Sequence, residues 1–220
     1  MTSNDAPAIL HLELLSDSTF SRGEGTAGAV DTEVEHDESG LPFIGGKTVR
    51  GLLRDAWLSM CDCFPDLHAA ADRVLGRSRC LDESCRLRFG DALLPEPLRR
   101  PVRAAAERTE KPLSPETILA AFTEIRYQTA EDRDTGAPAT TTLRSSRVVL
   151  RGFSFESRLT WLGGYDPAPD DLRLLALCAL VTRHGGLLRN RGRGHLRLSL
   201  DGNNEKTRRL ANSDPAKREA

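Results

Sequence analysis

Residues that could perform acid–base or metal chemistry occur early in the chain, in the run Asp31-Thr-Glu-Val-Glu35. Successive side chains of an extended chain point to opposite faces. Asp31, Glu33 and Glu35 would therefore share one face, with Thr32 and Val34 on the other. Three carboxylates on one face could bind a cation, and they could equally be the solvated face of a strand. The residues alone leave both interpretations open.

A glycine-rich basic segment, residues 185–194, has the composition of a phosphate-binding loop. Glycine lets backbone N–H groups approach a phosphate closely, and arginine forms charge-assisted hydrogen bonds to it. The stretch from Arg183 to Arg197 holds five arginines, two histidines and no carboxylate. Because the strand expected next carries no aromatic residue for base stacking, we expect contacts with a nucleic-acid backbone. His184 and His195, which flank the loop, could instead supply a general base for RNA cleavage.

A second glycine-rich turn, Gly45-Gly-Lys-Thr48, resembles the end of a nucleotide-triphosphate loop. The upstream glycine of such a loop is missing, because position 41 is Leu41 and Gly40 is one residue out of place. We therefore reject ATP binding. A phosphate of another kind could still bind at the start of the helix that follows, for which Thr48 is the expected N-cap.

Four of the five cysteines lie close together, which points to a metal site or to chance rather than to a disulfide framework. A structural Zn²⁺ needs four nitrogen or sulfur ligands and would stabilise a polar segment too small to form its own core. The clustered soft ligands are Cys61, Cys63, Cys80 and Cys85, with His68 as the alternate ligand. Free thiols near a helix end are the other interpretation.

The overall charge is balanced but unevenly distributed. The 220 residues carry 31 basic and 32 acidic groups, and the net charge of −1 gives no general reason to expect nucleic acid. Only four of the basic residues are lysines, and the others are arginines, whose planar guanidinium matches phosphate. No apolar run approaches the roughly 20 residues of a membrane span, and the N-terminus lacks the features of a signal peptide. We expect a cytoplasmic protein that does not contact a membrane.

The hydrophobic pattern predicts one α+β domain over residues 1–200. Strands are expected at Ala8–Leu15, Asp31–Glu35, Phe89–Leu94, Arg147–Trp161 and Gly194–Leu200, and helices after Thr48, at Asp66–Leu75, after Ser114 and at Leu172–Thr182. This is the βαββαβ order of an RRM-like, modified ferredoxin-like domain. Two insertions are expected, a Cys-bearing segment at about residues 61–88 and an exposed loop or hairpin at residues 126–146. Residues 95–112 are predicted to form a surface loop, and residues 201–220 a disordered polar tail.

The run from Gly28 to Arg54 and three later blocks resemble the RAMP superfamily, and more narrowly the Cas-seven-like backbone subunits of type III CRISPR effector complexes. In these proteins a strand ending in Asp precedes a Leu-Pro-aromatic segment, a turn, and a helix that starts with a basic residue and glycine. The later blocks are Arg86–Asp91, Thr129–Gly136 followed by Leu143-Arg144, and Arg191–Gly194. Gly45 stands where the family usually has proline.

The resemblance implies a subunit that polymerises along a guide RNA, which a thumb-like hairpin, residues 126–146, kinks at intervals. It further implies that this subunit cleaves the paired target RNA, that Asp31 is essential for cleavage, and that Mg²⁺ or another divalent ion could assist. Glu33 and Glu35 are secondary candidates. The same resemblance strengthens the case for a zinc ion at the cysteine cluster.

The expected partners are guide RNA, target RNA and other CRISPR effector subunits, including further RAMP subunits. The expected RNA-binding residues lie in glycine-rich or exposed basic segments: Gly46, Lys47, Arg50, Arg126, Arg133, Arg191, Gly192, Arg193 and Gly194. Two other functions stay open. One is a guide-binding scaffold that does not cleave, and the other is a guide-processing endonuclease that uses His184 or His195.

Overall fold

A computed structural model describes residues 6–21, 23, 25, 30–77, 85–131, 134–137, 139 and 142–213. Its centre is a five-stranded sheet in the order β2-β3-β6-β1-β7, in which every neighbouring pair is antiparallel. The strands are β1 (Ile9–Leu14), β2 (Phe43–Ile44), β3 (Leu87–Leu93), β6 (Ser154–Trp161) and β7 (Leu196–Leu200). Leu10, Leu12 and Leu14 alternate along β1 and are fully buried, because they face the helices.

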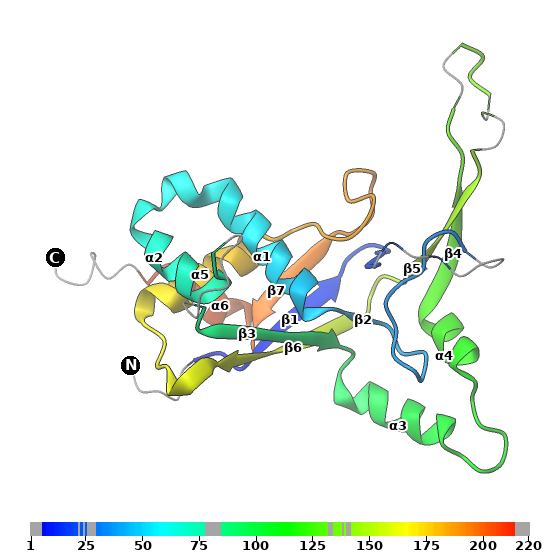
Figure 1. Ribbon diagram of the computed structural model, residues 1–220, viewed down its shortest axis with the longest axis horizontal. Helices are drawn as coiled ribbons and strands as arrows, with labels where there is room; N and C mark the ends of the chain where they lie inside the picture. The colour runs from blue at the N-terminus through cyan, green and yellow to red at the C-terminus, as the bar shows by residue number, and fades with distance from the viewer. Residues whose placement is uncertain are drawn as a thin grey trace.

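Four helices cover one face of this sheet (Figure 1). They are α1 (Gly46–Met60), α2 (His68–Leu75), α5 (Pro169–Val181) and α6 (Asn204–Ala211). The helix expected after Thr48 is confirmed as α1, and Val49, Leu53 and Trp57, spaced four residues apart on one face, are among its buried residues. Three short 3₁₀ segments occur at Cys61–Cys63, Pro65–Leu67 and Leu162–Gly164.

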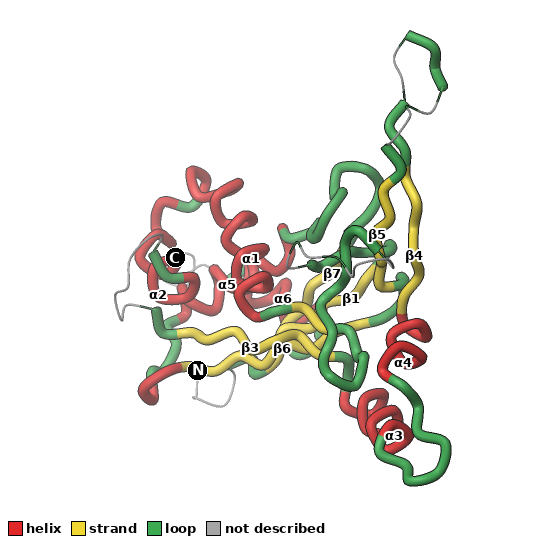
Figure 2. The backbone as a smooth tube through the Cα atoms, turned by 45° about the vertical axis from the view of Figure 1, so that its right-hand side comes forward, coloured by secondary structure: helices red, strands yellow, loops and turns green. Residues whose placement is uncertain are grey.

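A separate antiparallel hairpin projects away from the main sheet (Figures 1 and 2). It consists of β4 (Thr123–Gln128) and β5 (Arg144–Val149), and it follows directly on α4 (Pro115–Phe122). Ser114 caps α4 by accepting a hydrogen bond from the Thr117 amide, as the sequence predicts. The paired strands lie at the two ends of residues 126–146, where a loop or an exposed hairpin is expected, and the pairing starts three residues further out on each side.

Helix α3 (Glu96–Ala106) occupies much of the segment expected to be a surface loop, so that expectation is wrong. Pro97 lies in the first turn, where proline costs no helical hydrogen bond. Leu98, Val102 and Ala106 recur every four residues and pack against the core. The apolar spacing thus outweighs the proline-rich, basic composition.

The expectation of a disordered tail is also wrong for α6, at residues 204–211. The Asn203 side chain accepts a hydrogen bond from the Lys206 amide and caps the helix. Thr207 and Leu210, one helical turn apart, are both buried. The Leu200 amide also donates to Thr207 Oγ1 at 2.9 Å, so the cap, this hydrogen bond and one buried face hold the polar segment on the domain.

Three predicted boundaries also move. Helix α1 begins at Gly46, with Gly45 rather than Thr48 at its N-cap. The expected strand at residues 147–161 is the end of β5, a turn and β6, and these two strands belong to different sheets. The run 31–35 is extended but forms only an isolated bridge, between Thr32 and Ser146.

Candidate nucleic-acid interface

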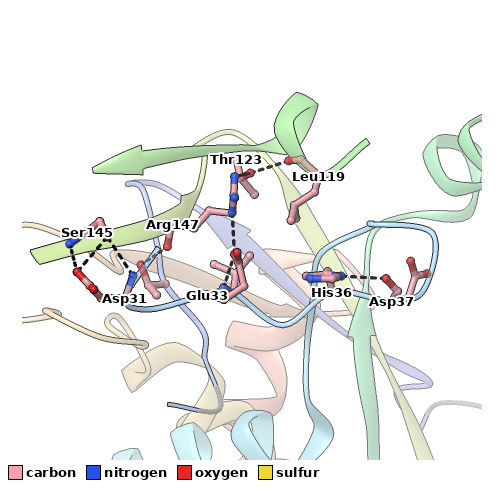
Figure 3. A network of polar contacts seen from close by, with 10 residues as sticks. Asp31, Glu33, His36, Asp37, Leu119, Thr123, Ser145 and Arg147 are labelled. Atoms are coloured by element: carbon pink, nitrogen blue, oxygen red, sulfur yellow. Dashed lines mark hydrogen bonds and ion pairs between the residues drawn. The ribbon is translucent and has the colours of Figure 1, made fainter. Parts of the chain in front are cut away.

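Asp31 is held on strand β5 by Ser145, although the two residues are 114 positions apart (Figure 3). Its Oδ2 accepts hydrogen bonds from the Ser145 amide at 2.6 Å and from the Ser145 hydroxyl at 3.0 Å. The Asp31 amide in turn donates to Ser145 Oγ at 3.0 Å. The pKa of Asp31 is lowered, mainly by the hydrogen bond from the Ser145 amide and next by the hydrogen bond from the Ser145 hydroxyl. The nearby Arg144 charge lowers it further, and slight desolvation opposes these effects. Asp31 is thus an oriented, exposed carboxylate.

The segment around Asp31 lies alongside β5 and is joined to it by one isolated parallel bridge, between Thr32 and Ser146. Thr32 donates from its amide to the Ser145 carbonyl at 3.2 Å, and the Arg147 amide donates to the Thr32 carbonyl at 2.9 Å. Because side chains alternate along an extended chain, Asp31 and Glu33 lie on the same face as Ser145 and Arg147. This supports the prediction that Asp31 and Glu33 share a face.

Glu33 and Glu35 nevertheless have separate structural partners. Glu33 Oε1 pairs with Arg147 Nε at 2.7 Å, and the two side chains are only 13% and 16% exposed. Glu35 Oε2 accepts from the Gly45 amide at 3.0 Å, at the start of α1. Among the described residues no group of three or more His, Cys, Asp or Glu side chains could hold a metal ion. The three carboxylates therefore do not converge on one cation site in this part of the chain.

A cleft of about 390 Å³ lies between the hairpin and the glycine-rich loop. The hairpin and its neighbours contribute Thr19, Thr32, Gln128, Thr129, Ala130, Thr142, Arg144, Ser145 and Ser146, and the loop contributes Leu187, Leu188 and Arg191. Arg193 Nη1 donates to Ser146 Oγ at 2.9 Å and so ties the loop to β5. The cleft thus brings Arg144 and Arg191, from two distant parts of the chain, to one polar surface.

Glycines set the shape of this loop. Gly194 has φ +70°, and a Cβ there would overlap the carbonyl oxygen of Gly185. The Gly185 amide donates a hydrogen bond to the Gly194 carbonyl at 2.9 Å. Gly192 has φ +79° and nothing within 4 Å of where a Cβ would be. Gly194 is therefore required to close the loop, whereas Gly192 leaves its backbone open to a ligand.

Three other predicted RNA-binding residues, Lys47, Arg50 and Arg126, are not among the residues that line this cleft. Lys47 and Arg50 line a separate hollow of about 300 Å³ beside β3, together with Gly46 and Arg88. Arg126 pairs with Asp17 at 2.9 Å and with Glu124 at 3.0 Å, so its charge is already balanced. Arg133 lies outside the described residues.

The start of α1 is occupied by carboxylates, which weakens the case for a phosphate there. Asp91 Oδ1 accepts from the Gly46 amide at 2.8 Å, and Glu35 accepts from the preceding amide. A Cβ on Gly46 would overlap the Phe89 carbonyl oxygen, so this glycine is needed for packing against β3. Gly45 has φ −57°, a value that proline also adopts, so its departure from the family pattern leaves the turn intact.

The cysteine cluster falls partly outside the described residues, because Cys80 is not among them. Cys61 and Cys85 are partly buried and Cys63 is exposed. The His68 ring packs edge-on against Trp57, with centroids 5.3 Å apart. Among the described residues these cysteines and His68 do not gather into a group of three ligands, so the Zn²⁺ site and its ligand set stay a prediction. Cys178, the fifth cysteine, lies in the core, and burial raises its pKa to about 12.

His184 and His195 face each other at the mouth of the loop. Their rings stack with centroids 5.1 Å apart, and their backbones form an antiparallel bridge. The pair closes the loop on the side of β7. Sequence reasoning missed Ser145 and Ser146 entirely, since no local spacing links them to Asp31 or Arg193.

The sheet, its one-sided helical cover and the projecting hairpin define a mixed α/β protein with an antiparallel sheet. The chain belongs to the RAMP superfamily, whose model matches residues 11–197. Its fold is similar to a chain in the cryo-EM structure of the type III-B Cmr-beta bound to cognate target RNA. The TM-score is 0.64 and the identity 13%, over 93% of this chain and 98% of that chain.

A chain in the apo state of type III-B Cmr-beta is similar to the same degree. There the TM-score is 0.62 and the identity 14%, over 92% of this chain and 99% of that chain. None of the curated proteins matches this chain. No helix among the described residues is long and apolar enough to cross a membrane.

Proposed function

We propose that this chain is a guide-RNA-binding backbone subunit of a type III CRISPR effector complex. Its partners would be guide RNA, target RNA and further subunits of the complex, in the cytoplasm. The observation that carries the proposal is the placement of Asp31 against strand β5 of a projecting hairpin, beside a cleft that includes Arg144 and Arg191. Membership of the RAMP superfamily and the Cmr-beta fold likeness support it.

The strand order also supports the finer description of the fold. The order β1-α1-β3-β6-α5-β7, with β6 between β3 and β1 and with β7 at the edge, is that of a ferredoxin-like domain. In this description α3, α4 and the hairpin are an insertion between β3 and β6. The hairpin would act as the thumb that kinks the guide.

RNA binding would act mainly through the phosphate backbone. Arg191 lines the cleft, Arg193 lies two residues further along the same loop, and the intervening Gly192 exposes its backbone. Guanidinium groups and backbone amides on phosphate fix an RNA in register without reading its sequence. A guide whose sequence changes from one complex to the next requires this kind of binding.

Asp31 would serve target cleavage. The target's own 2′-oxygen attacks the adjacent phosphorus, and the bond from phosphorus to the 5′-oxygen breaks. The hydroxyl proton is removed and the departing 5′-oxygen gains one, which leaves a cyclic phosphate and a 5′-hydroxyl. Because its pKa is lowered, Asp31 is ionised at neutral pH and suits holding that hydroxyl, or a divalent cation, better than removing a proton.

The deciding experiment compares Asp31→Asn with wild type in a reconstituted complex. Target RNA should bind with unchanged affinity, while cleavage at regular intervals disappears. Glu38→Gln is the matched control, because Glu38 is an exposed carboxylate seven residues away in the same acidic segment. Cleavage by Asp31→Asn at the same sites would make this chain a scaffold and place the chemistry in another subunit.

A further inference from the structure

Tyr127 is the most exposed of the large hydrophobic side chains in the described residues, at 65%. It lies on β4 directly opposite Ser145 of β5. Ser145 is the residue that holds the Asp31 carboxylate. Across the hairpin the order is therefore Tyr127, Ser145, Asp31, one residue from each of three adjacent strand segments.

These three side chains share one face. Directly opposite residues in an antiparallel pair point the same way, with Cβ atoms about 5 Å apart. The bridge between Thr32 and Ser146 and the hydrogen bonds of Asp31 place its carboxylate on the Ser145 side. Gln128 and Ser146, one residue further along β4 and β5, line the cleft, and Ser145 also reaches it. Tyr127 is not among the residues that line it.

The ring of Tyr127 has no structural role among the described residues. The aromatic contacts there join other residues, and its hydroxyl has no hydrogen-bond partner. An aromatic side chain left in water forgoes the stabilisation that burial would give. On a surface next to an oriented carboxylate, the flat ring is suited to stacking against another ring.

We propose that Tyr127 is a stacking platform for an unpaired base of the target RNA beside Asp31. This rests on the proposed function and adds to it a contact that holds the substrate. An unpaired base that stacks on Tyr127 would place its sugar and phosphate over Ser145 and Asp31. The distance from Tyr127 to Asp31 across the three segments is two strand spacings, or roughly 10 Å. Every base has a π face, so the platform accepts any target sequence.

The test uses the reconstituted complex and target RNA that carries one 2-aminopurine at successive positions. In wild type, the probe at one position in each cleavage interval should be quenched by stacking. Tyr127→Ala should abolish that quenching, weaken target binding at least about fivefold and slow cleavage. Tyr127→Phe, which keeps the ring, should restore both quenching and cleavage. The side chain is exposed, so neither change should alter thermal unfolding.

Leu143→Ala is the matched control. Leu143 is 64% exposed on the same hairpin but has no π face, so its loss should leave quenching intact. If the wild-type complex binds target RNA and Tyr127→Ala leaves both quenching and affinity unchanged, the stacking proposal is overturned and the proposed function stands. Lost assembly without lost quenching would also overturn it. A wild-type complex that binds no RNA would instead overturn the proposed function.

Discussion

Ser145 and Ser146 are consecutive residues of β5 whose side chains serve opposite faces of the strand. Ser145 donates to Asp31, and Ser146 accepts from Arg193. The carboxylate proposed for cleavage and an arginine proposed for binding are thus separated by the thickness of one strand. This arrangement keeps the carboxylate of Asp31 away from the phosphates that Arg193 would attract, while both contact the same hairpin.

Replacing Arg191 and Arg193 with Ala should weaken the binding of every RNA sequence by the same factor and flatten the salt dependence of binding. Each phosphate contact contributes about 0.7 to the logarithmic salt slope for single strands, so the double variant should lose about 1.4. Binding isotherms at several salt concentrations measure this slope. Arg209→Ala, an exposed arginine on α6, serves as control. Weakened binding of only some sequences would contradict backbone recognition.

Ser145→Ala should raise the pKa of Asp31 part of the way to its ordinary value of 3.8, because one of the two donors to its carboxylate is lost. The Ser145 amide still donates. A lowered pKa in the folded state means that Asp31 contributes stability above pH 3.8, which is lost as pH falls through the folded value. Carbon-13 NMR of labelled aspartate carboxyls follows the titration. Ser145→Thr keeps the hydroxyl and should leave the pKa of Asp31 low. Equal Asp31 pKa values in wild type and both variants would show that the Ser145 hydroxyl does not lower this pKa.

Gly194→Ala should destabilise the folded protein more than Gly192→Ala. Both glycines have positive φ, which costs an alanine about 1–2 kcal/mol. Only at Gly194 would the added Cβ also meet backbone, at the Gly185 carbonyl. Urea unfolding of the two variants gives the comparison. Equal losses of unfolding free energy in the two variants would show that the loop relaxes around the new methyl group. Closure of the loop would then not depend on Gly194.

The purified chain should contain one Zn²⁺, bound by Cys63, Cys80, Cys85 and either Cys61 or His68. Elemental analysis of protein prepared without chelators tests this, and Cys63→Ser should lose the metal because a hydroxyl is a poor zinc ligand. Cys178→Ser is the control, since Cys178 is fully buried in the core. Folded, RNA-binding protein with almost no metal would remove the prediction.

Local patterns in the sequence determined most of the helices and strands. The apolar spacing from Val49 to Met60 predicts α1, and the alternation in β1 and β7 predicts two strands of the sheet. The pattern failed at α3, where the proline-rich composition concealed an apolar repeat. It failed again at α6, where an Asn cap and three buried residues stabilise a polar segment.

The residue types of the candidate site were visible in the sequence, but only the tertiary structure decided which of them meet. Asp31 finds its partner 114 residues away, and Arg193 finds Ser146 at a separation of 47. Spacing along the chain encodes which side chains share a face of one element, because helices and strands have fixed periods. The meeting of two elements depends on strand order and hairpin register, which arise from packing of the whole core. For this reason Lys47 and Arg50, equally basic in sequence, lie at a different hollow from Arg191.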